Sequence, residues 1–177
     1  MDISMKRCIV TGGAGFIGSH LVERLIVDGH AVTAIDNFSI GHPEDLAHLK
    51  SHQRFVMYKA GVEDFATIRP LFDGADWVFH LAAMADLVPS IRNPRLYHDA
   101  NVNGTLSVLE SARAARVKRF IYSASSSCYG IPDAYPTPET APARPMHPYA
   151  LTKYVGEQYV MHWAQTYGLP AVSLRLF

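Results

Sequence analysis

Short apolar runs rich in β-branched residues alternate along the chain with longer stretches in which apolar residues recur every three or four positions. Near-continuous apolar runs are typical of strands buried in a parallel sheet, and the longer period is that of a helix with one buried face. Strands are predicted over residues 7–11, 31–36, 54–60, 76–81, 117–123 and 171–176. Helices are predicted over residues 15–28, 43–50, 64–72, 94–115 and 148–167, with a proline-rich loop over 130–145. The alternation predicts an α/β fold in which a doubly wound, mostly parallel sheet carries helices on both faces.

A glycine-rich turn joins the first predicted strand to the first predicted helix. Residues 13–18 fit the pattern G-x-G-x-x-G, and Gly12, Gly15 and Gly18 fit the related G-x-x-G-x-x-G. Such glycines let the backbone approach a pyrophosphate, which the helix N-terminus then binds through its free N–H groups. Asp36 ends the next strand, where its carboxylate can accept hydrogen bonds from the adenosine ribose and repel a ribose phosphate. The pattern predicts a dinucleotide site that favours NAD over NADP.

Tyr149 and Lys153 are four residues apart in the last predicted helix, so their side chains share one face. Pro148 suits the first helical turn, which places Tyr149 at the positive end of the helix dipole. The dipole and a nearby ammonium group both favour the phenolate form of Tyr149. Such a phenol can take a proton from a sugar hydroxyl while a nicotinamide accepts the hydride.

With the glycine-rich turn, this pair resembles the extended short-chain dehydrogenase/reductase family, in its nucleotide-sugar epimerase/dehydratase branch. That branch includes UDP-glucose 4-epimerases and the UDP-N-acetylhexosamine and uronate epimerases. The resemblance runs nearly end to end and is carried by residues 11–18, Asp36, Asn37, and residues 80–83, 101–105, 125–130 and 149–153. It implies a Rossmann fold, bound NAD, a nucleotide-diphosphate sugar as substrate, and a homodimer formed through the helices at 94–115 and 148–167.

The resemblance also assigns the site. It implies that Ser125 hydrogen-bonds the sugar hydroxyl, that Tyr149 transfers its proton, and that Lys153 assists Tyr149 and bonds the nicotinamide ribose. The expected NAD-binding residues are Gly12, Gly15, Phe16, Ile17, Gly18, Asp36, Asn37, Val62, Leu81, Ala82, Ala83, Asn101, Tyr149 and Lys153. No metal is expected.

Several positions depart from the family's pattern or distinguish its reactions. Dehydratases of the family carry an acid at one or both of the positions held here by Ser126 and Ser127. A serine cannot act as a carboxylic acid, so these two residues favour epimerisation over dehydration. The family's acid after the third strand, which meets the adenine, aligns with Gly61, although backbone near Val62 can still contribute. Ala85 replaces the lysine of the bacterial galactose epimerases. A net dehydrogenase or reductase, a dehydratase, and a non-catalytic NAD-binding module remain the alternatives.

The remaining composition excludes other classes of function. Lys plus Arg and Asp plus Glu both number 16, so no basic excess exists to bind nucleic acid or an anionic membrane. No apolar run approaches the roughly 20 residues that span a bilayer. Two cysteines and the lack of a signal peptide favour the cytoplasm.

Other candidate residues have plainer interpretations. His48 and His52 have no third metal ligand at a useful spacing, so a solvated helix face is expected. His80 is expected to be a hydrogen-bonded core histidine, and Cys128 a packing residue.

Residues 173–177 form an apolar strand without a polar tail. Residues 1–177 are therefore expected to be the NAD-binding domain, with a C-terminal substrate domain missing. Without that domain the isolated chain is expected to show no epimerase turnover.

Overall fold

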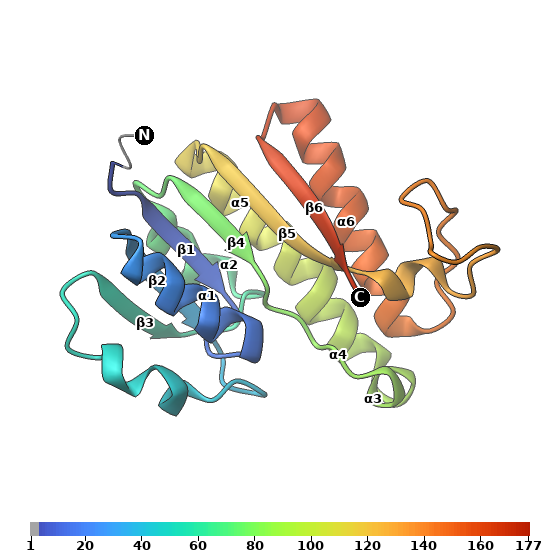
Figure 1. Cartoon of the computed structure of the whole chain (residues 1–177), viewed down its shortest axis with the longest axis horizontal. Coiled ribbons are helices and arrows are strands. Elements are labelled where there is room, and N and C mark those ends of the chain that lie inside the picture. The colour runs from blue at the N-terminus through green and yellow to red at the C-terminus, as the bar shows by residue number, and fades with distance from the viewer. Residues whose placement is uncertain (1–3) are drawn as a thin grey trace.

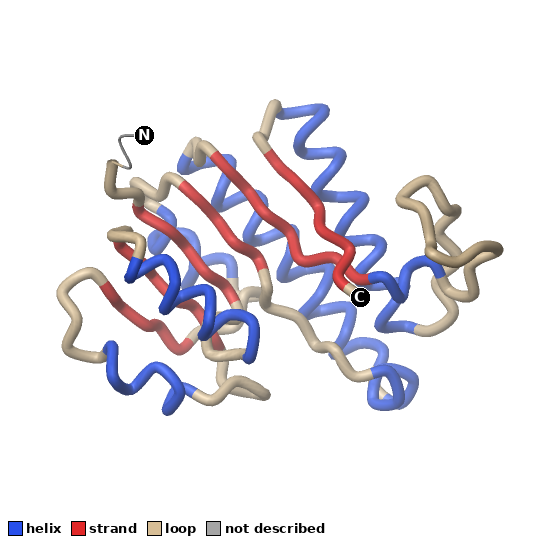
Figure 2. Tube along the Cα trace, in the orientation of Figure 1, coloured by secondary structure: helices blue, strands red, loops and turns tan. Residues whose placement is uncertain are grey.

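Six strands form one parallel sheet in the order β3-β2-β1-β4-β5-β6. The computed structural model describes residues 4–177, and Figures 1 and 2 show the sheet with its helices. The strands are β1 (Arg7–Thr11), β2 (Ala31–Asp36), β3 (Phe55–Lys59), β4 (Trp77–His80), β5 (Arg119–Ser125) and β6 (Ala171–Leu176). This confirms the predicted doubly wound α/β fold.

Helices and single helical turns connect the strands. The α-helices are α1 (Phe16–Val27), α2 (Phe65–Ile68), α3 (Leu87–Arg92), α4 (Pro94–His98), α5 (Gly104–Ala115) and α6 (Pro148–Tyr167). Tighter 3-10 turns are η1 (Pro43–Leu49), η2 (Arg69–Phe72) and η4 (Ser126–Tyr129), and η3 (Asp99–Asn103) is a wider π-helix. None of the helices within residues 4–177 combines the length and hydrophobicity that a bilayer crossing requires.

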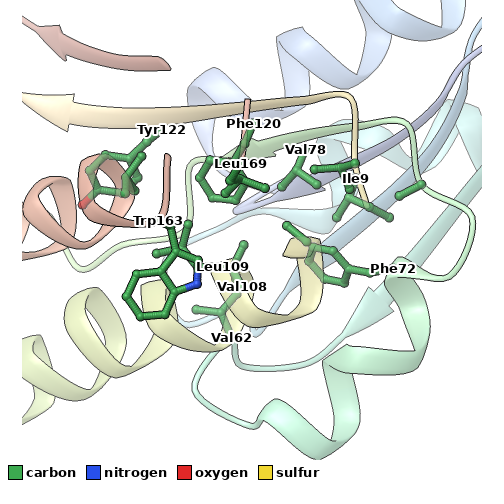
Figure 3. Close-up of a cluster of buried hydrophobic side chains, with 14 of the residues drawn as sticks. Ile9, Val62, Phe72, Val78, Val108, Leu109, Phe120, Tyr122, Trp163 and Leu169 are labelled. Atoms are coloured by element: carbon green, nitrogen blue, oxygen red, sulfur yellow. The ribbon is translucent and has the colours of Figure 1, made fainter. Parts of the chain in front are cut away.

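The two faces of the sheet carry different cores. On one face α1 and η1 pack over β1, β2 and β3 through a cluster that includes Val10, Val22 and Leu46. On the other face α2, α5 and α6 enclose a larger cluster, and Figure 3 shows Phe72 and Phe120 within it. Burial of these apolar side chains drives the packing of the layers.

Three predicted helices differ from the observed ones. The expected helix 94–115 is α4, η3 and α5 in succession, with the π-helix as a wide turn between them. The expected helix 64–72 divides into α2 and η2 because Pro70 has no N–H for an α-helical hydrogen bond. Residues 43–50 form the 3-10 helix η1, and α3 was not predicted because Pro89 interrupts its short apolar pattern.

The order of the strands creates a switch point between β1 and β4. From β1 the chain moves outward through β2 and β3, and it then returns to β4 on the other side of β1. The loops after β1 and β4 consequently leave the sheet in different directions, and ligands of such sheets bind in the crevice between them. β5 runs to Ser125, two residues beyond its predicted end, and so brings Ser125 to the same edge.

Candidate functional site

A cleft lies at this switch point, outside the carboxyl ends of the strands. Its walls come from the glycine-rich turn, the end of β2 and the loops after β3 and β4. Eight predicted NAD-binding residues line it: Gly12, Gly15, Asp36, Asn37, Val62, Leu81, Ala82 and Ala83. The fold therefore gathers residues from four separate strand ends around one cleft.

The glycine-rich turn needs glycine where the chain crosses itself closely. Gly12 has a φ of 70°, and a Cβ there would lie 2.7 Å from the Ala82 backbone nitrogen. A Cβ on Gly18 would overlap the Gly12 carbonyl, so only glycine lets α1 start this close to the turn. Gly15 caps α1 without any side-chain hydrogen bond, which leaves the first N–H groups of the helix available to an anion.

Phe16 and Ile17 lie in this first turn, with 81% and 52% of their surfaces exposed. Their side chains do not line the cleft, nor does Gly18. What these three positions offer a ligand is their backbone N–H groups at the helix N-terminus.

The Asp36 carboxylate is buried at the end of β2 and is fixed by backbone. Its Oδ2 accepts from the Ala14 N–H at 3.0 Å, and its Oδ1 accepts from the Phe38 N–H at 2.8 Å. Each oxygen keeps a second lone pair for a further donor. Asp36 thus presents an oriented carboxylate to the cleft and ties the glycine-rich turn to the loop after β2.

Asn101 lies behind the cleft in η3, and only 1% of it is exposed. Its Oδ1 accepts from the Met84 N–H at 2.8 Å, while its Nδ2 donates to the Met84 carbonyl at 3.0 Å and to the Thr152 hydroxyl at 3.0 Å. The side chain therefore fastens the cleft-lining loop after β4 to helix α6. This placement depends on the wide π-turn, which sequence periodicity did not indicate.

His80 confirms the expected core histidine. It is fully buried, and its ring nitrogens bond the Thr11 hydroxyl at 2.7 Å and the Thr105 hydroxyl at 2.9 Å. The Thr105 hydroxyl also donates to the Asn101 carbonyl. Burial lowers the pKa of His80 to about 3, and the Lys153 charge acts in the same direction. A neutral His80 consequently links β1, β4 and α5 beneath the cleft.

Tyr149 and Lys153 lie in the first two turns of α6, and Ser125 ends the neighbouring strand β5. The His147 Nδ1 caps α6 by accepting from the Ala150 N–H at 3.3 Å, and the His147 ring stacks on the Tyr149 ring. The Ser125 hydroxyl accepts from the Ser127 N–H and shares a 2.8 Å hydrogen bond with the Ser127 hydroxyl. These contacts hold the partly buried Ser125 and Tyr149 at the carboxyl edge of the sheet.

The Lys153 ammonium lies over the buried ring of Tyr122, with Nζ 4.3 Å from the ring centroid. Burial lowers the pKa of Lys153 to about 7, and the Glu157 carboxylate one turn later opposes that shift. Glu157 is itself engaged with Arg175 and Ser173 on β6. Lys153 is therefore supported by an aromatic face rather than by a direct salt bridge.

We expect Lys153→Met to raise the free energy of unfolding, and by more at pH 6 than at pH 9. An unfolded lysine has a pKa of about 10.4, so between that pH and the folded pKa of about 7 the unfolded chain binds more protons than the folded one. The burial of charged Lys153 destabilises the folded protein fully below pH 7, the pKa of the folded lysine. This destabilisation decreases as the pH rises toward 10.4. Since one pKa unit is about 1.4 kcal/mol, the gain at pH 6 should exceed that at pH 9 by at least about 1 kcal/mol.

Urea unfolding of the unmodified protein and of Lys153→Met, at pH 6 and at pH 9, measures the gain in the free energy of unfolding at each pH. Lys50→Met, at an exposed position, is the matched control and should show no such pH dependence. Equal gains from Lys153→Met at pH 6 and pH 9 would contradict a buried ammonium.

Some cleft residues were missed by the sequence analysis. They are Ile35, Ser39, Ile40, Gly41, Ala60, Glu63, Met84, Ala85 and Ala100. Those next to the ends of β2, β3 and β4 follow from the rule that parallel strands present their carboxyl ends to a ligand. Residues 39–41 reach the cleft through the His42 N–H, which donates to the Ala14 carbonyl at 2.8 Å and folds the loop back over the turn.

Other side chains considered in the sequence have structural surroundings. His48 contacts Glu23 at 3.1 Å, and nowhere in residues 4–177 do three His, Cys, Asp or Glu side chains converge as metal ligands would. Burial raises the pKa of the Cys128 thiol, which agrees with its interpretation as a packing residue.

The sequence of the chain matches a known family and individual members of it. The model of the NAD dependent epimerase/dehydratase family matches residues 8–177. The chain is 39% identical over 170 residues to UDP-glucose 4-epimerase of Mycolicibacterium smegmatis, an alignment that covers 92% of this chain and 53% of that protein.

Solved structures are similar as well. UDP-N-acetylglucosamine 4-epimerase from Methanobrevibacter ruminantium, in complex with UDP-N-acetylmuramic acid, superposes with a TM-score of 0.92 at 36% identity, over 98% of this chain and 55% of that one. UDP-glucose 4-epimerase from Brucella ovis, in complex with NAD, has a TM-score of 0.89 at 33% identity, over 97% of this chain and 52% of that one. The chain spans about half the length of the relatives it matches.

Proposed function

The chain belongs to the NAD dependent epimerase/dehydratase family, and from that premise we propose that it supplies the NAD-binding domain and proton-transfer residues of a nucleotide-sugar epimerase. NAD is the cofactor, and the substrate is a nucleotide-diphosphate sugar such as those named for its relatives. The observation that carries the proposal is the buried Lys153, which lies one helical turn from Tyr149 and over the ring of Tyr122 on β5.

The residues of the cleft fit NAD in chemistry and in shape. The uncapped N-terminus of α1, with the N–H groups of Phe16, Ile17 and Gly18, suits the pyrophosphate. The oriented carboxylate of Asp36 suits the adenosine ribose hydroxyls, and the adjacent Asn37 adds a polar wall. Bound NAD would supply the hydride acceptor for oxidation of a sugar carbon and the hydride donor for its reduction from the opposite face.

Three side chains of the protein then handle the proton. Tyr149 removes it from the sugar hydroxyl as the carbon is oxidised and returns it when the carbon is reduced. Lys153, one helical turn from Tyr149, would assist the proton transfer and donate a hydrogen bond to the nicotinamide ribose. Ser125 orients the same hydroxyl, since its own hydroxyl is already fixed by Ser127.

The serines of η4 favour epimerisation over dehydration. Ser126 and Ser127 stand where a dehydratase would carry an acid, and a hydroxyl cannot protonate a leaving group as a carboxylic acid does. Ser127 is occupied in hydrogen bonds with Ser125. A net dehydrogenase on the same scaffold is the second candidate, because oxidation needs the same Tyr149 and Lys153.

Product analysis without added cofactor tests the proposal. The catalytically complete protein that carries this domain, incubated separately with UDP-glucose and UDP-N-acetylglucosamine, should produce the 4-epimer of at least one of them, detected by proton NMR, with no lasting absorbance at 340 nm. NADH formed in proportion to substrate would identify a dehydrogenase instead. A 4-keto-6-deoxy product would identify a dehydratase.

Association and location are parts of the same proposal. Leu151 and Met161 on α6 expose about half of their surfaces, at 50% and 48%, along a groove that also includes Val155. This face supports pairing of two chains through their long helices. The two free thiols, Cys8 and Cys128, agree with a cytoplasmic setting.

A further inference from the structure

Two aromatic rings flank Pro148 at the start of α6. The ring of His147, the residue before the helix, stacks on the ring of Tyr149, with 6.0 Å between the ring centroids and 10° between the planes. Nearly parallel rings at such a separation attract each other. The ring that we propose for proton transfer therefore has a stacked aromatic neighbour two residues away.

The backbone between the two rings has little freedom. Pro148 fixes its own φ and restricts the residue before it to an extended conformation. His147 has that conformation, with a φ of −152° and a ψ of 162°. On the other side, Pro148 and Tyr149 already belong to the first turn of α6. The two side chains therefore leave a stiff backbone at a fixed separation, which favours one placement of the rings.

A hydrogen bond fixes the ring of His147 in turn. Its Nδ1 accepts from the Ala150 N–H at 3.3 Å, one of the N–H groups at the start of α6 that have no carbonyl partner within the helix. An imidazole nitrogen accepts through a lone pair in the plane of the ring. The cap bond consequently uses the edge of the imidazole and leaves its face for Tyr149.

Tyr149 is only partly buried, and its hydroxyl has to stay available to the sugar. The orientation of its side chain must therefore be set through the ring rather than through the oxygen. We propose that His147 is a positioning residue, and that the face of its ring holds Tyr149 in the orientation in which the phenol meets the sugar hydroxyl. The inference rests on the proposed function of Tyr149 and gives His147 no contact with the substrate.

Two substitutions in the catalytically complete protein that carries this domain separate the ring of His147 from its cap bond. His147→Asn removes the ring but keeps an acceptor for the Ala150 N–H, since asparagine is among the best helix caps. Its urea midpoint should stay near that of the unmodified protein, while kcat falls about five- to tenfold and KM stays within about twofold. His147→Phe keeps an aromatic face but has no acceptor. It should lower the urea midpoint and keep kcat within about twofold of the unmodified value.

Nuclear magnetic resonance provides a readout that does not depend on turnover. In protein with carbon-13 in the tyrosine rings, the Tyr149 resonance is the one that Tyr149→Phe lacks. His147→Asn should move this resonance, because a stacked ring shifts the signals of its neighbour, and His147→Phe should move it less. His98→Asn, which replaces an exposed histidine in the same hollow before α6, is the matched control and should change neither this resonance nor kcat.

The outcomes distinguish the role of His147 from the function of the site. An unchanged kcat in His147→Asn would overturn the role of His147 and leave the proposed function intact. A fall of kcat in His147→Phe as large as that in His147→Asn would overturn the role as well, because an aromatic face would then not suffice. No epimer formation by the unmodified protein, or normal turnover by Tyr149→Phe, would instead overturn the proposed function.

Discussion

Replacing Tyr149 with phenylalanine is expected to lower turnover at least ~10²-fold and to change the dissociation constant of NAD by no more than a few-fold. The substitution removes the phenolic oxygen that exchanges a proton with the sugar hydroxyl. It keeps the aromatic ring, which stacks on His147. The loss should therefore appear in kcat rather than in cofactor affinity.

Initial rates of epimer formation by the catalytically complete protein that carries this domain, and titration with NAD, measure the two quantities separately. Tyr154→Phe is the matched control, because it removes a tyrosine hydroxyl from the same helix α6, and its rate should stay near that of the unmodified protein. Near-normal turnover by Tyr149→Phe would remove Tyr149 from the proton-transfer step.

Removing the charge of Asp36 is expected to collapse the preference for NAD over NADP. Two unit charges about 4 Å apart repel by about 4 kcal/mol at an effective dielectric constant of 20. If half of this applies at the mouth of the cleft, the unmodified protein should prefer NAD by roughly 30-fold. Asp36→Asn removes the repulsion and should reduce that preference to a few-fold.

The ratio of the two affinities is the quantity to measure, because Asp36 also accepts from the Ala14 and Phe38 N–H groups. A loosened glycine-rich turn would lower the affinities for NAD and NADP by the same factor and would leave their ratio unchanged. Asn37→Ala, which removes a neutral neighbour in the same cleft, should preserve the preference. Equal affinities of the unmodified protein for NAD and NADP would contradict the electrostatic role of Asp36.

Residues close in the chain made much of this protein predictable. The alternation of strands and helices predicted the fold, and the Gly12–Gly15–Gly18 spacing predicted the turn before α1. Each of these patterns depends on only one or two neighbouring elements. The same holds for the pair Tyr149 and Lys153, which a regular helix places on one face whatever surrounds it. The strands β1, β2 and β6 consequently have their predicted bounds.

The contacts that hold the site residues in place could not be predicted from local sequence patterns, because they join elements that lie far apart in the chain. Lys153 lies over Tyr122 on another element, and Asn101 reaches Met84 through a π-turn that has no sequence period. The sequence alone predicted the residues that we propose for the chemistry, because local spacing decides which side chains share a helix face or a turn. Only the tertiary structure decided that the side chain of Lys153 is buried, because packing across the core brings β5 and α6 together.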